Sequence, residues 1–96
     1  MKNFSVNIRF DFPDDFMKYV PEHRTLINML INTNVIESYA VSMETRRSWI
    51  ILNAESKEAV EQILIKSPLY KFWTYDIDEL FVYDSQNFRL PKLELN

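Results

Sequence analysis

Residues 48–54 read Ser-Trp-Ile-Ile-Leu-Asn-Ala, and the four consecutive apolar side chains of this stretch decide how the chain folds. An uninterrupted apolar run predicts a strand covered on both faces, because a strand with one solvated face alternates apolar and polar residues. Residues 36–43 predict a second strand, which the tight polar connection Glu44-Thr45-Arg46-Arg47 joins to the first. The segment is therefore predicted to be a β-hairpin whose second strand lies inside a sheet.

The flanking segments predict two further strands and two helices. Residues 4–10 alternate apolar and polar side chains, as a half-buried strand does. Residues 72–83 predict the last strand, where a one-residue slip of the apolar phase across Asp78-Glu79 indicates a bulge. One amphipathic helix is predicted before the hairpin, and a second helix follows it, capped by Ser56 and stopped by Pro68. The predicted order is β-α-β-β-α-β.

Pro21 lies inside the first predicted helix and leaves two alternatives. The helix shows one apolar stripe over four to five turns, made by Phe16, Val20, His23, Ile27, Leu30 and Ile31. A proline in a helix interior removes a backbone hydrogen bond, whereas a proline in the first turn removes none. Either the helix is kinked at Pro21, or a short first turn ends there and a second helix starts with the proline near its N-terminus.

The element order predicts the α+β class, with a ferredoxin-like antiparallel sheet of four strands and both helices on one face. The other face would leave half of the apolar run 49–52 exposed, and a second copy of the sheet covers it most simply. We therefore expect a homodimer in which two sheets face each other, which is a dimeric α+β barrel. Residues 1–84 form this domain, and residues 85–96 form either a frayed tail or an arm that packs on a neighbouring subunit.

The composition excludes several classes of function. The 96 residues contain no glycine and no cysteine, which excludes glycine-rich phosphate loops, disulfides, thiol nucleophiles and cysteine-ligated metals. A net charge of -3 is the opposite of the basic footprint that a nucleic acid requires. We expect no cofactor and no metal. We also expect no membrane partner, because no stretch approaches the roughly 20 apolar residues of a membrane span. A cytoplasmic location is the default expectation.

Four stretches between Leu26 and Val82 carry a resemblance to a known family. They are Leu26 with Leu30, Ser56-Lys57-Glu58-Ala59, Ser67-Pro68-Leu69-Tyr70-Lys71-Phe72, and Asp76-Ile77-Asp78-Glu79-Leu80. Through them, more than half of the chain resembles the muconolactone isomerase family of dimeric α+β barrel proteins. The resemblance implies cofactor-free isomerase chemistry on a small lactone-like or organic acid substrate, in a homodimer or a higher homo-oligomer. The motifs are structural, and a shared fold does not by itself carry a shared activity.

The chain departs from that family at positions that bear on activity. Ala40 and Val41 stand where those enzymes have a Trp-Arg pair, and His23 stands at an acidic position of the first helix. The lost arginine removes the natural partner of a substrate carboxylate, because a guanidinium binds carboxylates as a bidentate fork. Three alternatives follow: another arginine substitutes for it, the substrate differs, or there is no substrate. The candidate substitutes are Arg9, Arg46 and Arg47.

Two glycine positions of the family are also exchanged. Asn34 stands where the relatives end the first helix with glycine, and Glu44 replaces a glycine at the hairpin. Asparagine tolerates the left-handed backbone conformation that a helix end often needs. The first exchange is therefore expected to preserve the fold.

Two groups of residues are candidates for the site. His23 is the single histidine, and its side chain suits proton transfer near neutral pH, although a core histidine with a satisfied ring is the alternative. Asn7 and Arg9 on the first strand lie beside Asp76 and Asp78 on the last strand. The second group forms either a cross-strand pair on the surface or the polar patch of a barrel cavity.

Aromatic side chains complete the prediction. Tyr39 and Trp73 would stack on a planar ligand, or belong to the core and interface. The resulting hypothesis is a small-molecule-binding barrel protein with cofactor-free isomerase chemistry. Its catalytic residues would be His23, Asp76 and Asp78, and its ligand contacts Asn7, Arg9, Tyr39 and Trp73. The competing hypothesis is a non-catalytic oligomerising or ligand-sensing domain that kept the fold without the active site.

Overall fold

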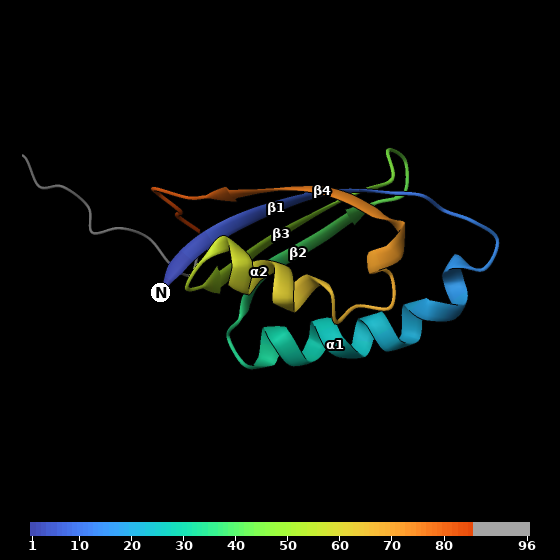
Figure 1. Cartoon of the computed structure of the whole chain (residues 1–96), viewed down its shortest axis with the longest axis horizontal. Coiled ribbons are helices and arrows are strands. Elements are labelled where there is room, and N and C mark those ends of the chain that lie inside the picture. Colours follow the sequence, from blue (N-terminus) through green and yellow to red (C-terminus); the bar gives the residue numbers. More distant parts are fainter. Residues whose placement is uncertain (86–96) are drawn as a thin grey trace, which may run out of the picture.

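Two α-helices cover one face of a four-stranded antiparallel sheet in the computed structural model, which describes residues 1–85 (Figure 1). The sheet order is β2-β3-β1-β4, and every neighbouring pair is antiparallel. The strands are β1 (Lys2–Phe10), β2 (Ile36–Ser42), β3 (Arg47–Ala54) and β4 (Trp73–Glu79), and the helices are α1 (Val20–Asn32) and α2 (Lys57–Leu64). The architecture confirms the predicted α+β class and is consistent with a ferredoxin-like fold.

The element order contains two short 3-10 helices that the sequence pattern did not predict. They are η1 (Phe16–Tyr19), directly before α1, and η2 (Tyr70–Phe72), directly before β4. Each one turns the chain at the same end of the sheet, and together they help to form the second, smaller apolar cluster of Phe10, Phe16 and Leu69. The predicted C-terminal arm, residues 85–96, lies outside the described residues apart from Ser85.

The main core lies between the helices and the two inner strands. Ile50 and Leu52 of β3 are 1% and 0% exposed, so the apolar run of β3 is buried on its helix side as predicted. Trp49 and Ile51 point to the opposite, open face, and Trp49 is 39% exposed. The core is completed by Ala54 at the end of β3 and by residues from the other elements: Phe4, Val6, Ile8, Ile27, Leu30, Ile36, Val60 and Leu64.

The structure selects the second alternative for the first helix. Pro21 lies in the first turn of α1, and the short turn η1 ends just before it. A proline in this place removes no helical hydrogen bond, because first-turn N–H groups have no partner within the helix. The arrangement sends His23 inward on the buried side of α1, together with Ile27 and Leu30.

Two non-glycine residues hold the left-handed backbone conformation that glycine usually takes. Asn34, directly after α1, has a φ of 63°, as expected from its place at the helix end. Arg46 in the hairpin turn has a φ of 54°. Its guanidinium carbon lies 5.3 Å from the centre of the Phe12 ring, a cation–π contact that stabilises the turn.

The last strand is shorter than predicted, and the predicted bulge is wrong. β4 pairs with β1 without a register shift from Trp73 opposite Phe10 to Glu79 opposite Phe4. The apolar phase slips after Glu79 because the following residues lie beyond the strand. The irregularity found in the sheet lies between Ile36 and Ser38 of β2 instead.

Candidate functional site

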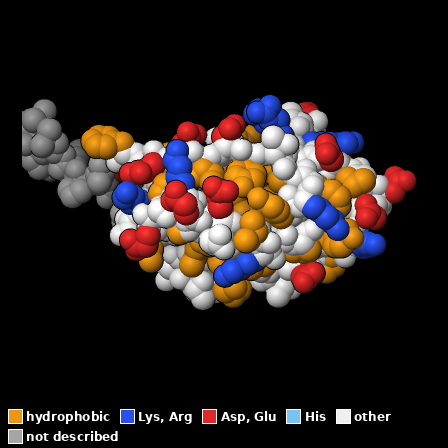
Figure 2. Space-filling view, viewed as in Figure 1, with side chains coloured by type: hydrophobic (Ala, Val, Ile, Leu, Met, Phe, Trp, Pro, Cys, Tyr) orange, Lys and Arg blue, Asp and Glu red, His pale blue; other side chains and the backbone are white. Residues whose placement is uncertain are grey.

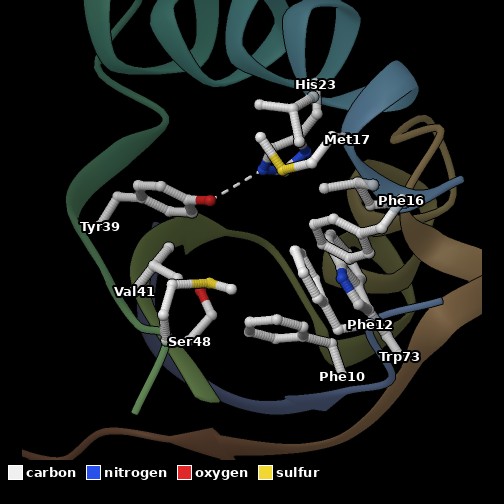
Figure 3. A pocket seen from close by; sticks show the side chains of 12 residues that line it. Phe10, Phe12, Phe16, Met17, His23, Tyr39, Val41, Ser48 and Trp73 are labelled. Atoms are coloured by element: carbon white, nitrogen blue, oxygen red, sulfur yellow. Dashed lines mark hydrogen bonds between the residues drawn. The ribbon is translucent and has the colours of Figure 1, made fainter. Parts of the chain in front are cut away.

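A cavity of about 180 Å³ lies between the sheet and the start of α1 (Figure 3). Tyr39 reaches into it from β2, and His23 reaches into it from α1. The remaining walls are apolar or hydroxyl-bearing and come from the strands, the short helices and their connections: Phe10, Phe12, Phe16, Met17, Val20, Val41, Met43, Ser48, Leu69 and Trp73. Among the described residues, no aspartate, glutamate, lysine or arginine lines this cavity.

The cavity results from a small side chain on the helix-facing side of β3, at a position where a large apolar residue would fill the space. Ser48 faces the helices in line with Ile50 and Leu52, and it pairs with Val41 on β2. Because serine and valine are smaller than the residues further along the same face, the space under the start of α1 is not filled. The cavity opens between η1 and the end of β2, where Met17 and Met43 are more than half exposed.

A chain of hydrogen bonds runs along the α1 side of the cavity. The backbone N–H of Leu69 donates to Ser67 Oγ at 3.1 Å. Ser67 Oγ lies 2.7 Å from His23 Nδ1, and His23 Nε2 lies 2.8 Å from Tyr39 Oη. Both ring nitrogens of the buried histidine therefore have partners, which satisfies the polar atoms that burial would otherwise leave unpaired.

Burial keeps the ionisable groups of the cavity uncharged. Desolvation, with a smaller contribution from the positive charge of Arg24, lowers the pKa of His23 to about 4. Desolvation also raises the pKa of Tyr39, although the neighbouring Ser48 hydroxyl and the charge of Arg24 oppose the rise. At pH 7 the histidine is therefore a neutral imidazole and the tyrosine a neutral phenol.

The predicted site residues separate onto the two faces of the sheet. His23, Tyr39 and Trp73 line the cavity, and the edge of the Trp73 ring packs against the His23 ring with centroids 5.8 Å apart. Asn7 and Arg9 are on the face of β1 that points away from the helices, since Val6 and Ile8 between and beside them are buried. The structure thus brings together three of the predicted residues on one side of the sheet.

The polar group on the open face has the neighbours expected of adjacent antiparallel strands. Asn7 lies opposite Asp76, and Asp78 lies opposite Ser5. Arg9 lies opposite Thr74 rather than opposite a carboxylate. Within residues 1–85, the ion pair within 4.0 Å joins Lys2 and Glu79 instead, at 3.8 Å and well exposed.

Several residues in or beside the cavity were not predicted as site residues. Ser67 appeared in the sequence only as part of the turn that follows the second helix, yet it holds the His23 ring from a position 44 residues further along the chain. Ser48 and Phe16 also line the cavity. A serine whose hydroxyl accepts a hydrogen bond from the N–H two residues later is a signal of a local turn. Its contact with His23 could not be predicted from the local sequence, because it depends on how α1 packs against this turn.

Comparison of the chain with protein-family models and with curated proteins gave no match. The resemblance to the muconolactone isomerase family therefore stays a prediction. Across residues 1–85, no helix is long and apolar enough to cross a membrane. The same residues contain no group of three or more histidine or acidic side chains placed to hold a metal ion. In the view of Figure 2, acidic and basic side chains are interspersed, without a broad basic patch on that face.

Proposed function

We propose that this chain binds a small organic molecule in the cavity between α1 and the sheet. The observation that carries the proposal is a cavity of about 180 Å³ whose apolar walls surround one polar edge, made by His23 and Tyr39. An apolar cavity of about 150 Å³ stays dry and binds benzene. A space of this size and lining therefore suits a ligand of one ring better than it suits water.

The geometry supports binding better than proton transfer between carbons. An isomerase needs a group that takes a proton from the substrate and returns it. Both ring nitrogens of His23 already have hydrogen-bond partners, and a pKa of about 4 makes the ring a weak base. Asp76 and Asp78, the other proposed catalytic residues, belong to the opposite face of the sheet. These placements favour the ligand-binding hypothesis over the isomerase hypothesis.

Toluene is expected to change the fluorescence of Trp73 but not that of Trp49. The chain has two tryptophans, and they stand on opposite faces of the sheet, with Trp73 in the cavity wall. The Trp49→Phe variant therefore leaves a reporter in the cavity, and the Trp73→Phe variant leaves one on the open face. Titrating both variants with toluene measures where the probe binds.

A saturable signal in the Trp49→Phe variant alone supports the cavity site. The proposal is wrong if neither variant responds, or if both respond in parallel, because parallel signals indicate unspecific contact with the surface. A fluorescence change in the Trp73→Phe variant alone would place the probe on the open face.

We also propose that two copies of the chain pair through their open faces to form the dimeric α+β barrel. Trp49 and Ile51 supply an apolar centre on this face, and the side chains around it are mostly polar. The charges are self-complementary, with Arg9 and Arg47 on paired positions at one end and carboxylates along β4. Because a two-fold contact sets one surface against itself, the arginines of one copy can meet the carboxylates of the other.

The Trp49→Glu variant is expected to be a monomer at micromolar concentrations at which the wild type is a dimer. A carboxylate at the centre of the contact would lose its hydration without a partner. Light scattering after size exclusion measures the mass of both. The Ile65→Glu variant is the control, since Ile65 is an exposed apolar residue just beyond α2, on the helix side of the sheet. A monomeric wild type, or a control variant that also dissociates, contradicts this proposal.

A further inference from the structure

The hydrogen-bond chain beside the cavity has a direction. Ser67 is 5% exposed, and its Oγ already accepts from the N–H of Leu69. Within residues 1–85, the acceptor in reach of the Ser67 hydroxyl proton is His23 Nδ1. If Nδ1 carried the ring proton, the serine would be left with a buried donor and no acceptor, which costs free energy. The arrangement therefore favours the tautomer of His23 that is protonated at Nε2.

The tautomer determines what Tyr39 offers to the cavity. A protonated Nε2 donates to Tyr39 Oη, so the tyrosine acts as the acceptor in that bond. The phenolic proton is then left for another acceptor. Ser48, which also lines the cavity, donates its own proton to the carbonyl of Ala40 at 3.1 Å and keeps an acceptor lone pair, so a ligand oxygen competes with Ser48 Oγ for the phenolic proton. Tyr39 is thereby held as a hydrogen-bond donor at the edge of an apolar space.

The lining also sets the charge of the ligand. No cationic side chain of the described residues lines the cavity; Arg24 is outside the lining, with its guanidinium carbon 5.7 Å from the centre of the Tyr39 ring. A carboxylate placed inside would lose its hydration without gaining an ion pair, which is strongly unfavourable. A neutral oxygen needs only one donor.

The aromatic walls set its shape. The ring of Phe16 packs against Phe10 with centroids 5.4 Å apart and an interplanar angle of 25°, and against Phe12 at 4.7 Å. Trp73 lies on the same side of the space, packed against the cluster of Phe10, Phe16 and Leu69, and its ring also contacts that of His23 with centroids 5.8 Å apart. Flat rings facing a cavity of about 180 Å³ leave room for one ring and a short substituent.

We propose, building on the proposed small-molecule binding, that the ligand is an uncharged single-ring aromatic compound with one carbonyl or ether oxygen, which accepts a hydrogen bond from Tyr39. His23 is a positioning residue in this arrangement. Both of its ring nitrogens are engaged by Ser67 and Tyr39, and it keeps the tyrosine proton directed at the cavity.

The test uses a matched pair of probes, acetophenone and α-methylstyrene. They have the same shape, but acetophenone carries a carbonyl oxygen where α-methylstyrene carries a methylene group. Calorimetric or NMR titration of the wild type and of the Tyr39→Phe variant gives four dissociation constants. The variant is expected to bind acetophenone about fivefold more weakly, as the loss of one neutral hydrogen bond predicts, and to bind α-methylstyrene unchanged. Benzoate, the charged analogue, is expected to bind the wild type more weakly than acetophenone at pH 7.

The outcomes separate the two proposals. If neither neutral probe binds the wild type, the proposed function itself fails. If both bind but Tyr39→Phe affects them equally, or if benzoate binds most tightly, the ligand class is wrong while the cavity remains a binding site.

The tautomer can be observed directly, because the chain has a single histidine. The nitrogen chemical shifts of its ring at pH 7 are expected to show a neutral imidazole protonated at Nε2. The Ser67→Ala variant is expected to lose this preference and to bind acetophenone more weakly, with α-methylstyrene binding unchanged. A ring protonated at Nδ1 in the wild type, or equal loss of both probes in the variant, would overturn the role of His23.

Discussion

Lowering the pH from 7 to 4 is expected to remove about 3 kcal/mol from the free energy of unfolding through His23 alone. The side chain is 4% exposed, and burial lowers its pKa to about 4 in the folded chain. In the unfolded chain the pKa returns to about 6.5. Between these two values the unfolded state binds a proton that the folded state does not bind, so acidification favours unfolding.

The sign of this effect defines the pH window of the measurement. Above about pH 6.5 the histidine is neutral in both states, and the stability is at its full value. It falls as the pH approaches 4, where the folded form also begins to take up the proton. Protonation also breaks the bond from Ser67, because a ring protonated at both nitrogens cannot accept a hydrogen bond.

Urea unfolding of the wild type and of the His23→Gln variant at a series of pH values isolates this contribution. Exposed carboxylates titrate in both proteins, so their effect cancels in the difference. The variant is expected to be the less stable protein at pH 7, and its disadvantage should shrink by about 3 kcal/mol as the pH falls to 4. Parallel curves for the two proteins would show that His23 is not held in its neutral form.

The local sequence was sufficient to predict the elements whose ends carry their own chemical signals. Ser56 accepts a hydrogen bond from the N–H of Ala59 and begins α2 where a cap was expected. Asn34 takes the left-handed conformation after α1. The unbroken apolar run of β3 predicted a central strand, and β3 lies between β2 and β1 in the sheet.

Other boundaries depend on contacts that no local pattern contains. The regular pairing of β4 with β1 ends at Glu79, opposite Phe4, and the N–H of Leu80 makes one further bond to the carbonyl of Asn3 at 2.8 Å. The residues after Glu79 remain partly apolar, and the pattern was therefore extended too far. The turn η2 was also missed, because its place follows from the packing of Leu69 in the small cluster with Phe10 and Phe16.

The site was partly predictable for the same reason. His23 was recognisable as a lone histidine on an apolar helix face, and the structure places it in the cavity wall. The cavity itself was not predictable, because it results from a small residue, Ser48, facing the start of a helix that is distant in sequence. The acidic and basic residues of the open face were predicted as a group. Their contacts depend on whether a second copy of the chain covers this face, which is a property of the assembly and not of the local sequence.

The two faces of β2 allow the ligand and dimer proposals to be tested with neighbouring substitutions. Val41 lines the mouth of the cavity and is 46% exposed, whereas Ala40 is exposed and pairs with Trp49 of β3 on the open face. The Val41→Trp variant is expected to weaken toluene binding by about tenfold or more, because the indole occupies the entrance and part of the space. Its dimer mass and melting temperature should stay close to those of the wild type, since Val41 is not a core residue.

The Ala40→Trp variant is the matched control, with the same side chain introduced one residue away on the opposite face. It is expected to bind toluene as the wild type does and to dissociate the dimer, because the bulky ring holds the two sheets apart. NMR titration with toluene and light scattering on both variants therefore give a crossed pattern, with each variant losing one property and keeping the other. If Val41→Trp still binds the probe tightly, the site lies elsewhere than at this cavity. If both variants lose both properties, the cavity and the open face are not independent, and ligand binding depends on the assembly of two copies.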